Sequence, residues 1–140
     1  GPKKNYHTLA SFEAKDIGLN TDFVASFWIY NQGKNFGQDM LNCMFILQEK
    51  DGDNSKWRNI TNPMHSLVVN GNWTLVEMNF KLTKPKAHID FILKGNEQSK
   101  VNVYIDDFLI YKKTSINYFI DFDNTTGKTV IVKNNQRIKL

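Results

Sequence analysis

Two adjacent carboxylates, Asp106 and Asp107, lie in the middle of the apolar segment VNVYIDDFLIYKK, residues 101–113. The segment predicts a β-strand, in which neighbouring side chains point to opposite faces of the sheet. One of the two carboxylates would then face the core, where an unpaired charge is costly. The pair therefore requires some feature of the structure that makes it tolerable.

The other chemically active side chains show no recognisable catalytic arrangement. A glycosidase needs two carboxylates across a cleft, within about 10 Å of one another, and adjacency in the chain does not supply that geometry. The single cysteine, Cys43, lies in the apolar run MLNCMFIL and is interpreted as a buried apolar residue. No phosphate-binding glycine loop, Ser-His-Asp pattern or histidine cluster is evident, so we expect a protein that is not an enzyme.

Length and charge favour one globular domain with no nucleic-acid partner. The chain has 140 residues, enough for a sizeable core. Its net charge of +4 is mild, its lysines are spread out, and no nucleic-acid-binding motif is present. No apolar run is long enough to span a bilayer, so we expect no direct membrane insertion. The opening Gly1-Pro2 resembles the scar of a cleaved expression tag.

Alternation of apolar and polar residues with period two recurs along the chain, whereas helical spacing is nearly absent. Clusters of Gly, Asn, Asp and Pro separate the alternating segments at roughly ten-residue intervals. One such cluster, EKDGDNS, is interpreted as a hairpin turn and not as a calcium loop. The pattern predicts an all-β sandwich or jelly roll of two antiparallel sheets. Its expected core-facing residues are Phe23, Ala25, Phe27 and Ile29; Leu41, Cys43, Phe45 and Leu47; Val76, Met78, Phe80 and Leu82; and Ala87, Ile89, Phe91 and Leu93.

Three segments in order resemble the strands of jelly-roll carbohydrate-binding modules, which accompany many bacterial xylanases and related glycoside hydrolases in the galactose-binding-like superfamily. DFVASFWIY resembles their Ser-Phe-Trp strand, NWTLVEMNFKL their next tryptophan strand, and VYIDDFLIYK their closing Asp-Asp strand. The resemblance covers Phe23 to Tyr111. A second resemblance, to laminin-G-like sandwich domains, rests on the same first strand. That family prefers Asp-Gly where this chain has Asp106-Asp107.

The first resemblance implies an accessory domain of a larger extracytoplasmic protein, secreted, periplasmic or on the cell surface. Its partner would be a polysaccharide or other glycan, stacked on exposed aromatic rings in a groove on a sheet face. The alternative is a structural domain that docks against a neighbouring domain of its parent protein, because Met40, Met44 and Ile46 would make the face apolar. The candidate ligand-binding residues are Trp28, Tyr30, Trp57, Asn42, Gln48 and Glu77, with Trp57 expected on a polar loop.

The resemblance also implies an answer for the paired carboxylates. Closing strands of such modules often bulge at the Asp pair, so that Ile105 and Phe108 would both face the core. An aspartate at this position often helps to hold a structural calcium ion, which takes six to eight oxygen ligands. The candidate metal ligands are Asp106, Asp107 and Glu13. The alternative is that the two aspartates cap backbone amides or pair with a lysine such as Lys112.

The expected domain organisation has three parts. Residues 1–2 are the tag scar, residues 3–113 form the jelly-roll sandwich, and residues 114–140 form a C-terminal β-hairpin extension packed on the same domain. The hairpin is predicted from the strand-like segments INYFIDF and KTVIVK on either side of DNTTG.

Overall fold

The structure is a computed structural model that describes residues 5–66, 68–95 and 103–113. Residues 118–123, 128–133 and 136–139 are described as backbone. The strands are β1 (Tyr6–Glu13), β2 (Asp22–Asn31), β3 (Met44–Asp51), β4 (Asn54–Thr61), β5 (Val69–Asn70), β6 (Trp73–Lys81), β7 (His88–Lys94), β8 (Val103–Lys112), β9 (Tyr118–Asp123), β10 (Lys128–Lys133) and β11 (Gln136–Lys139). Three single-turn helices are α1 (Ala14–Ile17), α2 (Phe36–Asp39) and η1 (Pro63–His65).

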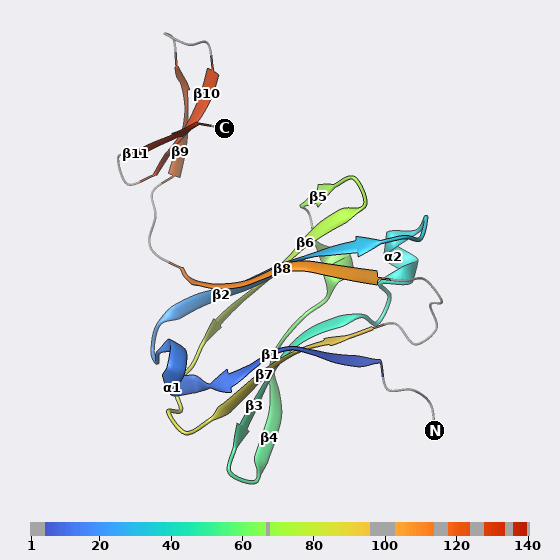
Figure 1. Ribbon diagram of the computed structural model, residues 1–140, viewed down its shortest axis with the longest axis vertical. Coiled ribbons are helices and arrows are strands. Elements are labelled where there is room, and N and C mark those ends of the chain that lie inside the picture. Colours follow the sequence, from blue (N-terminus) through green and yellow to red (C-terminus); the bar gives the residue numbers. More distant parts are fainter. Residues whose placement is uncertain are drawn as a thin grey trace.

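Two antiparallel four-stranded sheets pack face to face and form an all-β sandwich, which confirms the predicted fold class (Figure 1). The first sheet has the strand order β1-β7-β3-β4, and the second has the order β5-β6-β2-β8. Most connections cross from one layer to the other, so strands far apart in the sequence become neighbours. A third sheet, of order β11-β10-β9, contains the hairpin predicted around DNTTG, with one strand added.

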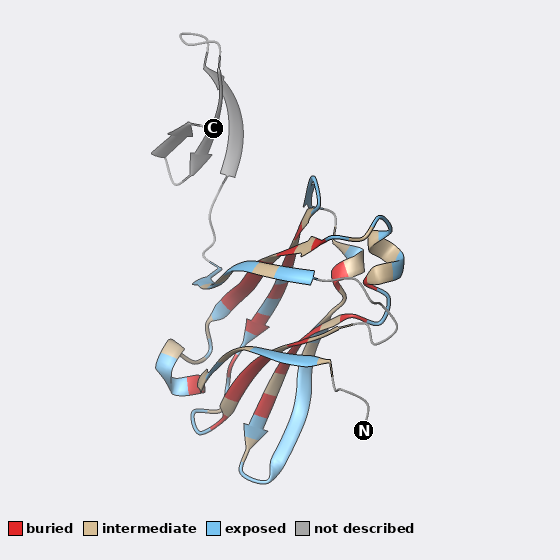
Figure 2. Cartoon of the chain, turned by 45° about the vertical axis from the view of Figure 1, so that its right-hand side comes forward, coloured by how far each residue is buried: buried red, intermediate tan, exposed pale blue. Residues whose placement is uncertain are grey.

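The core lies between the two layers, where the buried positions of both sheets face one another (Figure 2). Four phenylalanines join the layers: Phe27 and Phe108 from the second sheet, Phe45 and Phe91 from the first. Their ring centroids lie 4.9 Å apart for Phe27–Phe45 and 5.7 Å apart for Phe91–Phe108. The predicted inward alternation of β2, β6 and β7 is confirmed. Leu41 is exposed, contrary to the prediction, because β3 begins only at Met44 and the preceding turn buries Met40 instead.

The bulge expected at the paired carboxylates is present. Strand β8 pairs Asp106 with Trp28 and Leu109 with Ser26, so Asp107 and Phe108 together oppose Phe27. Asp107 takes a left-handed backbone conformation with φ of 55°. The shift allows Ile105 and Phe108 both to pack against the core, and both carboxylates stay exposed. The Asp107 N–H donates to Asp106 Oδ1 at 2.9 Å, which is the amide-capping alternative.

Each of the three long edge strands carries an extra residue. The register of β1 shifts between Thr8 and Ala10, and that of β4 shifts at Arg58, in addition to the bulge in β8. A bulge in an edge strand interrupts the regular row of unpaired N–H and C=O groups that another strand could join.

The bulge in β4 has a second effect, because it directs Arg58 to a buried carboxylate. Glu49 on β3 is only 1% exposed, and its Oε2 accepts a hydrogen bond from Arg58 Nη1 at 2.8 Å. Its Oε1 lies 3.7 Å from Lys84 Nζ, which is an ion pair without a hydrogen bond. The charge of Glu49 is therefore compensated mainly by Arg58.

Removing Arg58 should be one of the most destabilising changes at the surface of the sandwich. We expect Arg58→Ala to lower the free energy of unfolding by about 3–5 kcal/mol, because it leaves the Glu49 carboxylate buried with only the more distant lysine. Urea denaturation measures the loss. The double variant Glu49→Met with Arg58→Met should recover most of it, and Lys84→Met should cost less. Equal losses from Arg58→Ala and Lys84→Met would contradict this account.

The conformation of Asp107 gives a second stability prediction. A β-branched residue at this left-handed position is strained by about 1–2 kcal/mol, whereas glycine is not. Asp107→Ile should therefore unfold at lower urea concentration than Asp107→Gly. The reverse order would show that the bulge is not held in this backbone conformation.

Candidate ligand-binding face

An aromatic row crosses the outer face of the second sheet. Cross-strand pairing places Tyr104 of β8, Tyr30 of β2 and Trp73 of β6 side by side. The ring centroids of Tyr104 and Tyr30 lie 6.1 Å apart, and those of Tyr30 and Trp73 lie 5.1 Å apart. Tyr104 is 50% exposed, whereas Tyr30 and Trp73 are half-buried. These rings form a continuous surface on which flat, weakly polar groups can stack.

Trp28 extends this row along β2. It lies two residues before Tyr30, on the same outer face of the sheet. It lies between Leu75 of β6 and Asp106 of β8, and it is half-buried. We call the surface made by Tyr104, Tyr30, Trp73 and Trp28 the aromatic face. Polar groups border it: Asn72 Nδ2 donates to the Tyr30 hydroxyl at 3.3 Å, and the Tyr111 hydroxyl lies 3.5 Å from Glu77 Oε2.

The structure brings three of the six candidate ligand-binding residues together. Trp28, Tyr30 and Glu77 share the outer face of the second sheet. Gln48 and Trp57 oppose one another on the first sheet. Asn42 lies in the turn before β3, with φ of 64°.

The expectations about aromatic residues need one correction and one addition. Trp57 lies in strand β4 and not on a loop; β4 was missed because it is a polar edge strand with no buried face. Tyr104 was not among the sequence candidates, although it lies in the same segment as the paired carboxylates. Its place beside Tyr30 depends on the pairing of β8 with β2, which alternation within one strand does not reveal.

The three candidate metal ligands do not meet. Asp106 and Asp107 belong to the second sheet, whereas Glu13 ends β1 in the first sheet and bonds His88 there. Within residues 5–66, 68–95 and 103–113, no cluster of three or more His, Cys, Asp or Glu side chains has the geometry of a metal site.

The outer face of the first sheet holds a polar network that the sequence did not reveal. His88 Nδ1 lies 2.8 Å from Glu13 Oε1, and His88 Nε2 lies 2.9 Å from Ser11 Oγ. Asp90 Oδ1 accepts from the Ser11 hydroxyl at 2.6 Å, and Asp90 Oδ2 lies 3.5 Å from Lys50 Nζ. Pairing of β1 with β7 creates this network from residues more than seventy positions apart.

The network has the distances of a Ser-His-acid triad but not its proton arrangement. The hydrogen bond to Glu13, together with the charge of Asp90, raises the pKa of His88. Burial alone would raise the pKa of Asp90, but the Ser11 hydroxyl, His88 and Lys50 together lower it. The Ser11 hydroxyl proton is directed to Asp90 Oδ1, so the contact between Ser11 Oγ and His88 Nε2 does not have the direction that a Ser-His nucleophile pair needs. The network is therefore best explained as a link between strands β1, β7 and β3.

Cys43 is buried, as interpreted from the sequence, and burial raises the pKa of its thiol to about 11. The thiol is thus protonated at neutral pH and has no nucleophilic character.

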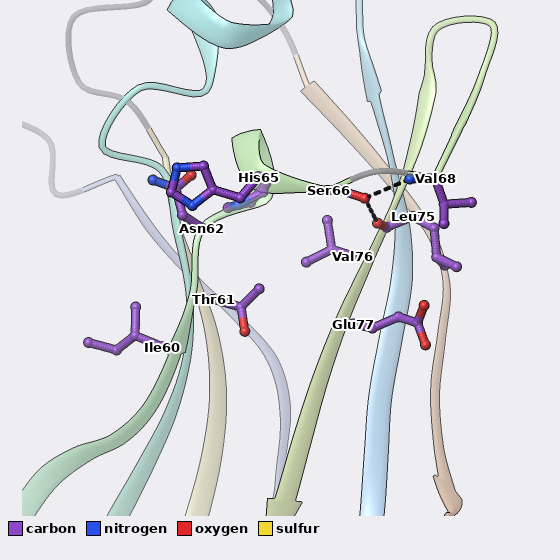
Figure 3. A pocket seen from close by; sticks show the side chains of 10 residues that line it. Ile60, Thr61, Asn62, His65, Ser66, Val68, Leu75, Val76 and Glu77 are labelled. Carbon is purple, nitrogen blue, oxygen red and sulfur yellow. Dashed lines mark hydrogen bonds between the residues drawn. The ribbon is translucent and has the colours of Figure 1, made fainter.

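An open pocket of about 480 Å³ lies at the edge of the sandwich between β4 and β6 (Figure 3). Thr61 of β4 and Val76 of β6 point into it, and the segment after η1 closes one end (Figure 3). The Ser66 hydroxyl donates to the Leu75 carbonyl and accepts from the Val68 N–H, which fixes this segment to β6. We call it the edge pocket; its lining residues are Ile60, Thr61, Asn62, Pro63, His65, Ser66, Val68, Leu75, Val76 and Glu77.

Comparison with known proteins identifies no relative: no family model, no curated protein and no solved structure matches the chain. In the part of the chain that the structure describes, no helix has the length and apolar character needed to cross a membrane.

The polar network predicts a stability that depends on pH. The pKa of His88 is raised by folding, so its contribution is complete below the ordinary value of 6.5 and is lost as pH rises through the folded value. Because His88 is more than one-third exposed and screened by solvent, we expect a loss of about 0.2–1 kcal/mol. Urea denaturation between pH 5.5 and 9 should show it, and His88→Gln should remove it. His65→Gln, a change at an exposed histidine outside the network, should leave it. An unchanged profile in His88→Gln would contradict the assignment.

Proposed function

We propose that this domain is a non-catalytic module that binds a glycan on the aromatic face. The observation that supports the proposal is the row Tyr104–Tyr30–Trp73, whose rings are neighbours across three strands on an outer sheet face. Sugar rings present apolar C–H faces that stack on such rings, and exposed aromatic rings in a row fit a chain of sugars better than a single compact ligand.

Polar groups around the row support the proposal, because their side chains are hydrogen-bonding partners for sugar hydroxyls. Asp106 of β8 lies opposite Trp28 on one side. On the other side Leu75 of β6 lies opposite Trp28, and Glu77 follows two residues later on the same face. Carboxylates accept hydrogen bonds from hydroxyls, and the Asn72 amide and the tyrosine hydroxyls can both donate and accept. In this proposal the aromatic rings contribute most of the affinity and the polar groups set the orientation of the ligand.

A second candidate function is docking against a neighbouring domain. Leu109 is 57% exposed on the same outer face, near Tyr111. An aliphatic side chain of this kind is of little use to a sugar and suits a protein surface. This candidate uses the β8 side of the face, whereas the glycan proposal uses the rings that cross it.

Affinity electrophoresis against a panel of soluble polysaccharides tests the proposal. We expect at least one polymer to retard the protein, with Tyr104→Ala weakening the affinity by about tenfold or more because truncating a central contact costs upwards of ~1.4 kcal/mol. Trp28→Ala should do the same. Trp57→Ala is the matched control, since Trp57 is 43% exposed on the opposite sheet.

Three results would count against the proposal. Retardation that survives Tyr104→Ala but is lost in Trp57→Ala would move the site to the first sheet. Retardation that no aromatic variant changes would exclude stacking. No retardation by any polymer, with the protein folded, would favour the docking function.

A further inference from the structure

The charged side chains of the second sheet are separated along its strands. They are Asp22, Glu77, Lys81, Asp106, Asp107 and Lys112. Both lysines lie at one end of the sheet, because Lys81 pairs with Asp22 at 3.4 Å and Lys112 lies opposite Phe23. Asp106 lies opposite Trp28 on the aromatic face. Glu77 follows Leu75, the other neighbour of Trp28, by two residues. The strands around Trp28 are therefore acidic, although the whole chain has a net charge of +4.

The lysines of the sheet are too distant to compensate the negative charge beside Trp28. A strand rises about 3.3 Å per residue, so Lys81 lies about 20 Å along β6 from Leu75. Interactions between exposed charges are largely screened beyond about 8 Å at physiological salt. Asp106 is much closer, because the Cβ atoms of residues that lie opposite one another on neighbouring strands are only about 4.5–5.5 Å apart.

The hydrogen bonds of these two carboxylates do not compensate their charge either. Asp106 Oδ1 accepts from the Asp107 N–H at 2.9 Å, and the Tyr111 hydroxyl lies 3.5 Å from Glu77 Oε2. Both donors are neutral groups. Both carboxylates belong to exposed residues, so a ligand on the aromatic face can reach them.

We infer that the aromatic face prefers a glycan with free, protonated amino groups, and that an ammonium group of this glycan lies over Trp28 beside Asp106. A cation over a tryptophan ring is attracted by the face of the ring, and a neighbouring carboxylate adds to the attraction. A hydroxyl in the same position gains neither contribution, and the carboxylate of a uronic acid is repelled. The inference rests on the proposed function and specifies its substrate class.

The charges at the other end of the face support this position for the ammonium group. Beyond Tyr30, Lys34 lines a small pocket of about 160 Å³ together with Asn72, whose amide donates to the Tyr30 hydroxyl. An ammonium group near Tyr30 would therefore approach another cation, whereas an ammonium group over Trp28 meets the carboxylates.

Isothermal titration calorimetry with two tetrasaccharides tests the inference. The fully deacetylated tetramer of chitin and cellotetraose have the same backbone and differ only at C2, which carries an ammonium group in the first and a hydroxyl in the second. The titrations are made at about pH 5.5, where the sugar amines are protonated and carboxylates of ordinary pKa are ionised. We expect the amino tetramer to bind about tenfold more tightly at low salt, and this preference to shrink in about 0.5 M NaCl.

The double variant Asp106→Asn with Glu77→Gln isolates the charge. Both new side chains keep an oxygen that accepts from the Asp107 N–H and the Tyr111 hydroxyl, so only the negative charge is lost. We expect the preference for the amino tetramer to fall to about twofold or less. The matched control is Asp16→Asn with Asp53→Asn, which removes the same charge from two exposed carboxylates outside the second sheet and should leave the preference intact.

The outcomes separate this inference from the proposed function. Equal affinities for the two tetrasaccharides, no binding of the amino tetramer, or a preference that both double variants change equally would overturn the inference, even if another polysaccharide binds through Tyr104. Tetralysine that binds as tightly as the amino tetramer would also overturn it, because charge alone would then be recognised. A salt-sensitive preference lost only in the Asp106 and Glu77 variant would support it, even if Tyr104→Ala changes no polysaccharide binding.

Discussion

The four phenylalanines that join the two layers impose the constraint on which the rest of the molecule depends. Phe108 reaches Phe45 and Phe91 only because β8 inserts an extra residue beside it. A regular strand could not direct both Ile105 and Phe108 to the core, since they differ by an odd number of positions. The same shift keeps Tyr104 on the outer face beside Tyr30 while Leu109 and Tyr111 remain outside further along. The aromatic core and the aromatic face are thus two consequences of one local change in register.

The outer faces of the two sheets differ in how many of their polar side chains bond one another. On the first sheet, Ser11, Glu13, His88, Asp90 and Lys50 bond one another, and Tyr6 and Trp57 approach to 6.4 Å between ring centroids while Ile46 is fully buried. On the second sheet the aromatic rings contact each other, but Tyr104, Leu109 and Tyr111 keep large exposed apolar surfaces. Exposed aromatic side chains lie on both faces, since Tyr6 and Trp57 on the first sheet are 39% and 43% exposed and Tyr104 and Tyr111 on the second are 50% and 45% exposed. The second face differs because its rings form a row across three strands.

Much of the sandwich could be predicted from alternation, because strands with one buried face have a period that the sequence shows directly. Strands β2, β6 and β7 are of this kind. Strand β4 is not: it is a polar edge strand without a buried face, and its contact with the buried Glu49 depends on a bulge that directs Arg58 inward. The resemblance to carbohydrate-binding modules predicted the bulge at Asp106–Asp107 but not the partners that make it necessary.

The candidate site was less predictable than the fold, for a physical reason. Trp28 and Tyr30 could be found because they alternate with a clear core face on one strand. The row that Tyr30 makes with Tyr104 and Trp73, and the network of Ser11 with His88, arise from pairing between distant strands. Pairing of this kind depends on how the whole chain is arranged in two layers, and a single strand carries little information about it.

The extra residues in β1, β4 and β8 have a consequence for how copies of this domain tolerate crowding. Copies of a domain that are held close together, at high concentration or on a surface, can join through exposed strands into continuous sheets. Interrupted edges oppose that reaction at both ends of the first sheet and at the β8 end of the second. Along β6, strand β5 pairs only with Trp73 and Thr74, so the rest of that edge has no strand beside it among the described residues. The interrupted edges of β1, β4 and β8 therefore make edge-to-edge joining of neighbouring copies less favourable.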